Sequence, residues 1–138
     1  MKSKEITRKE IEDKFLKMGD YVKMGYLSNC LRSGLDYDTK KFVLVKLAGL
    51  YQERKMYSDA AKMMMHAAEI NTTFQGQITD FVKSAELFVK GGDYSSTEII
   101  MKKAMALANE AQKGEIQRSV KEYFKTQGNF LIKNDKRN

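Results

Sequence analysis

Residues 44–67, LVKLAGLYQERKMYSDAAKMMMHA, decide how this sequence folds. The first half of the stretch places apolar residues at positions i, i+3, i+4 and i+7, which are Leu44, Leu47, Ala48 and Tyr51. The second half places them three or four positions apart, at Ala60, Met64 and Ala67. Such spacing lines up apolar side chains on one face of an α-helix. The stretch therefore predicts two amphipathic helices joined by a short polar turn.

The composition of the whole chain favours the same helical structure. The 138 residues include no proline, the residue that most strongly breaks helices. A hydrophobic fraction of 42% beside 31% charged residues is typical of a globular domain. No alternating apolar stretch indicates a sheet. The sequence predicts one all-α domain over residues 1–138.

The sequence contains no recognisable signal for export or membrane insertion. The N-terminal MKSKEITRKE lacks the apolar stretch of a secretory signal, and no run approaches the ~18 apolar residues of a membrane-spanning helix. The single cysteine, Cys30, can form no intrachain disulfide and does not indicate an oxidising compartment. We therefore expect a cytoplasmic protein with no membrane contact.

Aromatic residues recur along the chain with a nearly constant period. Four of them close short polar turns at separations of 36, 37 and 36 residues, namely Tyr21, Tyr57, Tyr94 and Phe130. Six residues before each stands another ring, at Phe15, Tyr51, Phe88 and Phe124. A fixed period of this order indicates a repeat protein in which each unit is one helical hairpin.

Residues 41–74 carry a large apolar residue, a Leu, a small residue and an aromatic on the first helix, then alternating small and large residues on the second. In this they resemble the tetratricopeptide repeat family. Residues 78–111 resemble it too, with Ser84 and Thr97 where Leu and Ala are expected. The resemblance implies a right-handed α–α superhelix of about three helical hairpins plus a C-terminal capping helix. Its approximate units are residues 5–38, 41–74, 78–111 and 113–132, followed by a basic tail at 133–138.

Gly91 and Gly92 precede a run of hydroxyl residues, a pattern that also occurs in phosphate-binding loops. A nucleotide P-loop needs a later Gly-Lys pair and a preceding strand, and both signals are missing. We predict instead that one of the glycines ends a helix and that Ser95 with Glu98 forms the capping box of the next. The same reasoning predicts helix starts at Thr7 with Glu10 and at Asp38 or Thr39.

The residue types needed for catalysis or metal binding are too few. His66 is the only histidine and Cys30 is remote from it in sequence, so neither a zinc set nor a Cys-His pair is indicated. We predict no catalytic residue, no metal and no cofactor, and therefore a protein that is not an enzyme. Residues 63–65, three consecutive methionines, are interpreted as packing residues, with an adaptable binding surface as the alternative.

The resemblance implies that first helices line a concave groove, where a partner protein would bind. The groove residues that we predict are Leu16, Phe42, Val45, Gln52, Glu53, Val82, Glu86, Val89 and Lys90. The apolar members among them suit an amphipathic helix or an extended segment of the partner. In the alternative interpretation, some of the valines pack against neighbouring first helices instead.

Positive charge is concentrated at the C-terminal end. The net charge is +7, and residues 113–138 contribute seven basic and three acidic side chains to it. Lys113, Arg118, Lys121 and Lys125 are candidate contacts to phosphates or to an acidic partner. The prediction is a non-catalytic adaptor. The alternatives are a nucleic-acid-associated protein that uses this basic region, or a structural homo-oligomer such as a homodimer.

Overall fold

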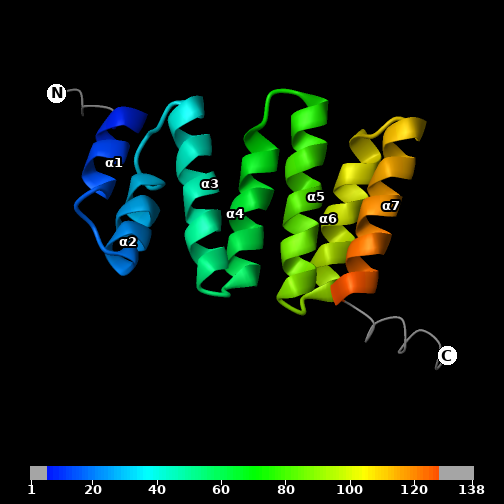
Figure 1. Ribbon diagram of the computed structural model, residues 1–138. Coiled ribbons are helices and arrows are strands. Elements are labelled where there is room, and N and C mark those ends of the chain that lie inside the picture. The colour runs from blue at the N-terminus through cyan, green and yellow to red at the C-terminus, as the bar shows by residue number, and fades with distance from the viewer. Residues whose placement is uncertain (1–5, 128–138) are drawn as a thin grey trace.

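The computed structural model describes the backbone of residues 6–127 and the side chains of residues 6–122. This part of the chain forms seven α-helices and no strand. They are α1 (Arg8–Phe15), α2 (Asp20–Cys30), α3 (Tyr37–Glu53), α4 (Tyr57–Ile70), α5 (Phe74–Lys90), α6 (Tyr94–Leu107) and α7 (Glu110–Gln127). Helices that follow one another pack as antiparallel pairs, in chain order across the molecule (Figure 1). The prediction of an all-α fold is confirmed, and none of these helices is both long and apolar enough to cross a bilayer.

The helix starts show which polar side chains cap them. Thr7 is the N-cap of α1, as predicted, and its hydroxyl accepts a hydrogen bond from the Glu10 amide at 3.2 Å. The prediction for α3 was wrong, because Asp36 caps this helix and accepts from the Thr39 amide at 2.8 Å. Asp36 lies two or three residues before the predicted start at Asp38 or Thr39, so α3 begins earlier than predicted. Apolar spacing alone does not mark this first turn.

The α5–α6 turn contains both glycines of the suspected phosphate loop. Gly91 is the C-cap of α5, and its amide donates to the Leu87 carbonyl at 3.0 Å. Gly92 has a φ of +76°, a conformation that other residues rarely adopt. The predicted Ser95–Glu98 capping box is wrong, since Asp93 is the N-cap of α6. Its carboxylate accepts from both the amide and the hydroxyl of Ser96, at 3.0 and 2.7 Å, and these bonds lower the pKa of Asp93.

The larger hydrophobic core runs from α3 to α7, and small residues let its helices approach closely. Ala60, Ala61 and Ala85 have no exposed surface. Ser84 stands between α5 and α4 with its hydroxyl donating to the Ala61 carbonyl at 2.7 Å. Met64 is buried in this core, and its two neighbours pack against it, which supports the packing interpretation of the three methionines.

A smaller core holds α1 and α2, which we call the N-terminal hairpin, against α3. Its fully enclosed members are Ile11, Leu27, Cys30, Val43 and Leu47. Two partly buried residues, Tyr51 and Met63, pack against this core and the larger one. The smaller core is therefore joined to the larger one through α3, which carries Tyr51, and α4, which carries Met63.

We predict that Gly91→Ala destabilises the fold by ~1–3 kcal/mol, the usual cost of overpacking. A Cβ at this position would lie 2.7 Å from Ser58 Oγ and 3.2 Å from the Ser58 backbone nitrogen. The matched control is Gly49→Ala in α3, where a Cβ meets nothing within 4 Å and helix propensity should add up to ~1 kcal/mol of stability. Urea unfolding followed by circular dichroism measures both, and equal effects of the two substitutions would contradict the close approach at Gly91.

Candidate functional site

Three hollows in the surface are lined almost entirely by α1, α3, α5 and α7 and by the loops at their ends. Their volumes are about 820, 530 and 330 Å³. Only one of the lining residues, Lys23 on α2, belongs to an even-numbered helix. We call the surface that contains these hollows the odd-helix face. It corresponds to the first helices of the predicted hairpins.

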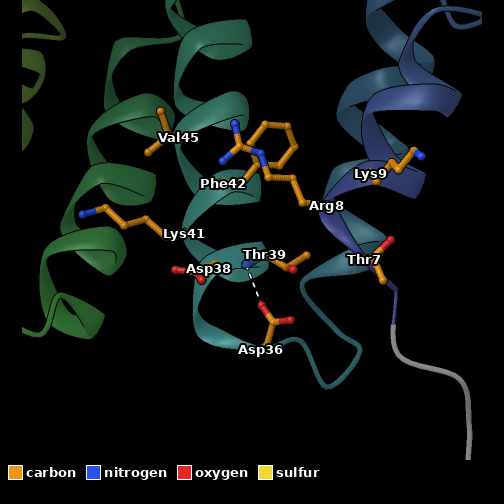
Figure 2. A pocket seen from close by; sticks show the side chains of 9 residues that line it. All are labelled: Thr7, Arg8, Lys9, Asp36, Asp38, Thr39, Lys41, Phe42 and Val45. Atoms are coloured by element: carbon orange, nitrogen blue, oxygen red, sulfur yellow. Dashed lines mark hydrogen bonds between the residues drawn. The ribbon is translucent and has the colours of Figure 1, made fainter.

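The largest hollow lies between α1 and α3 (Figure 2). It is lined by Thr7, Arg8, Lys9, Asp36, Asp38, Thr39, Lys41, Phe42 and Val45. Arg8 extends from α1 toward α3, and its guanidinium carbon lies 4.4 Å from the centre of the Phe42 ring. Val45 exposes 44% of its surface although it is apolar. The hollow thus combines an apolar patch with charges of both signs.

The second hollow continues around Phe42 toward the α1–α2 turn, and we call it the Phe15–Phe42 hollow. It is lined by Arg8, Glu12, Phe15, Leu16, Met18, Lys23, Phe42 and Lys46. Two lysine ammonium groups lie over its rings, Lys46 at 5.7 Å from Phe42 and Lys23 at 5.5 Å from Phe15. Leu16 follows the last residue of α1 and is 88% exposed.

A buried carboxylate connects the α3 and α5 portions of the odd-helix face. Asp80 on α5 is only 9% exposed, and its Oδ2 lies 3.1 Å from the Lys41 ammonium of α3. The same oxygen accepts a hydrogen bond from the Asn71 side chain at 3.1 Å. Lys41 and Asn71 together compensate the buried charge of Asp80. The ion pair in turn holds Lys41 at the edge of the largest hollow.

The third hollow lies between α5 and α7 and has acidic rims. Its apolar floor consists of Ile78, Val82 and Ile116, while Glu86 and Glu115 supply carboxylates and Lys83 one cation. Burial raises the pKa of Glu86, although the nearby Lys83 and Lys90 act in the opposite direction. Burial prevails over both lysines, so the Glu86 carboxylate is incompletely compensated in the folded protein.

The predicted groove residues separate into two groups. Leu16, Phe42, Val45, Val82 and Glu86 line the hollows. The other four line none of the three. Gln52 and Glu53 lie at the end of α3, Val89 is buried at 5% exposure, and the Lys90 ammonium lies 5.4 Å from the Tyr57 ring. For Val89 the packing alternative is the better interpretation. The sequence reasoning missed Arg8, whose only local signal was its i,i+4 spacing from Glu12, 2.9 Å away in the structure.

The predicted basic contacts all lie on α7. Lys113 is partly buried and 3.3 Å from the Glu110 carboxylate, whereas Arg118 and Lys121 are exposed. Lys125 belongs to the helix, but its side chain lies outside the described residues, as does the predicted tail at 133–138. Among the described side chains of this set, Arg118 and Lys121 are the exposed cations.

The residues considered for catalysis are dispersed. Cys30 is buried in the smaller core near Tyr26, and burial together with this thiol raises the pKa of Tyr26 to about 12. His66 is exposed on α4 with its Nδ1 3.6 Å from Glu69. Across the part of the chain that the structure describes, no three His, Cys, Asp or Glu side chains are placed to hold a metal ion.

Comparisons of the chain with protein-family models, curated proteins and solved structures found no match. The geometry and charges of the odd-helix face are therefore what indicate a function. The face has apolar side chains at its surface and charged rims.

We predict that Glu86→Gln stabilises the protein at neutral pH. Because the pKa of Glu86 is raised in the folded state, that state binds more protons than the unfolded chain between the ordinary and the raised pKa. Wild-type stability therefore falls as pH rises through this window, and the loss persists above it. Glu86→Gln removes this loss of stability. The difference in free energy of unfolding between the variant and the wild type should therefore shrink as pH falls below the ordinary pKa of glutamate.

The measurement is urea unfolding from pH 4 to pH 8. The matched control is Glu98→Gln on α6, which removes one carboxylate at an exposed position outside the three hollows. A Glu86→Gln profile parallel to that of wild type would show that its burial does not affect stability.

Proposed function

We propose that the chain is a tetratricopeptide-like, non-catalytic adaptor that holds a segment of a partner protein on its odd-helix face. The observation that carries the proposal is the position of the hollows, because all three are lined by the helices that would form the inner surface of such an array. The antiparallel pairing of successive helices and the buried alanines between them support the same architecture.

The chemistry of the face favours a protein partner. Leu16 and Val45 expose apolar surface beside charged rims, and this combination is typical of protein interfaces with an apolar centre and a polar edge. Carboxylates line the largest hollow, through Asp36 and Asp38, and the α5–α7 hollow, through Glu86 and Glu115. A nucleic-acid backbone would be repelled at these points. An amphipathic helix or an extended segment can place apolar side chains against Leu16 and Val45.

The test compares partner capture by three forms of the chain from a nuclease-treated lysate. We expect the wild type to retain a discrete protein that the variant Leu16→Glu, Val45→Glu loses, since both changes place a charge on the apolar part of the face. The matched control is Val22→Glu, Ile99→Glu, which alters two exposed apolar residues on the even-numbered helices α2 and α6.

Each form is first checked for helix content and unfolding midpoint. Equal capture by the two variants would contradict a role for the odd-helix face. Capture that nuclease abolishes, and that falls steeply as salt rises, would favour the nucleic-acid alternative. A concentration-dependent mass in light scattering, abolished only by the control substitutions, would favour homodimerisation.

A further inference from the structure

The Phe15–Phe42 hollow has an unusual arrangement of positive charge. Three cations from three helices surround its two rings, Arg8 and Lys46 over Phe42 and Lys23 over Phe15. Contact with the ring faces compensates part of the cost of bringing these cations together. Each cation therefore lies beside an aromatic side chain of the hollow, with Lys23 partly buried and Lys46 exposed.

The charge of the hollow is not balanced by its own acids. Glu12 is the only carboxylate among its lining residues, and it lies 2.9 Å from the Arg8 guanidinium. Among the described residues, no carboxylate lies within ion-pair distance of Lys23 or Lys46. Three cations against one carboxylate leave an excess of two positive charges beside the exposed side chain of Leu16.

We propose that the Phe15–Phe42 hollow binds an acidic, apolar-anchored segment of the partner protein. Side-chain carboxylates of the segment pair with Lys23 and Lys46, and one of its apolar side chains packs on Leu16. The inference rests on the proposed function and goes further, because it gives the partner's chemistry and the part of the odd-helix face where its acidic portion lies. The acidic rims of the α5–α7 hollow would repel the same portion, so charge also restricts where the segment can lie.

Phosphate groups of a nucleic acid fit the hollow less well than carboxylates of a polypeptide. A cation lies over each ring and competes with bases for the ring face, which is the surface that aromatic side chains use for stacking in single-strand binding. The exposed Leu16 offers apolar surface that a sugar-phosphate backbone cannot use. An acidic polypeptide uses both the cations and the leucine.

The experiment selects binders from a display library of random peptides in which both peptide ends are fused, so that no terminal carboxylate contributes. Binders are selected on the intact chain and on Lys23→Glu, Lys46→Glu. The matched control is Lys102→Glu, Lys103→Glu, which makes the same change in net charge with two exposed lysines of α6. Enriched peptides are then synthesised, and their affinities are measured by fluorescence anisotropy at two salt concentrations.

We expect peptides rich in Asp and Glu with a recurrent Leu or Phe. They should bind about tenfold or more weakly to Lys23→Glu, Lys46→Glu and with unchanged affinity to the control. Their affinity for wild type should fall as salt rises. A selected set without acidic enrichment, or acidic peptides that bind both variants equally, would overturn the inference, as would the absence of any enriched peptide.

The same selection separates this inference from the proposed function. Neutral or basic peptides that lose affinity for Leu16→Glu, Val45→Glu would leave the adaptor proposal standing while the acidic preference fails. Acidic peptides whose affinity is unchanged by Leu16→Glu, Val45→Glu and by both pairs of lysine substitutions would contradict the adaptor proposal and the acidic preference together. Displacement of the selected peptides by an oligothymidine of matched charge, with affinity greater than theirs, would overturn the choice of a polypeptide.

Discussion

The close approach of α4 to α5 is the contact on which the rest of the structure depends. Ala61 of α4 and Ala85 of α5 are small and fully buried, and Ser84 of α5 donates its hydroxyl to the Ala61 carbonyl at 2.7 Å. A large apolar residue at position 84, as the repeat pattern expects, would force the two backbones apart. The spacing of α3 and α7 follows from this pair, since both pack against helices that it positions.

The same contact determines where charge can lie on the odd-helix face. With α5 held against α4, Asp80 is buried. Its carboxylate accepts a hydrogen bond from the Asn71 side chain in the α4–α5 connection and forms an ion pair with Lys41 of α3. Lys41 is thereby directed toward α5, and the cations left around Phe42 are Arg8 and Lys46. The packing of α4 against α5 thus helps to separate the positive Phe15–Phe42 hollow from the acidic hollow between α5 and α7.

The all-α fold could be predicted from the sequence because apolar spacing reflects burial, which is local to each helix. Helix starts were harder, since Asp36 and Asp93 compete with nearby hydroxyl residues and only the folded turn shows which side chain reaches an amide. In the candidate site, Phe42 and Val45 could be predicted from their helical face. The partnership of Arg8 with Phe42 could not, because it joins helices far apart in sequence. Val89 was misplaced because α5 is buried on a broader face than the first-helix pattern implies.

The division into two cores gives the N-terminal hairpin a particular role. It is joined to the larger core through Tyr51 of α3 and Met63 of α4. It supplies Arg8 and Lys23 to the Phe15–Phe42 hollow, while α3 supplies Phe42 and Lys46. A ligand bound in this hollow contacts both α3 and the hairpin. Binding then stabilises the docking of the hairpin on α3, because a ligand that binds only the docked arrangement shifts the equilibrium toward it. The proposed recognition site therefore lies where ligand binding and the packing of the smaller core are coupled.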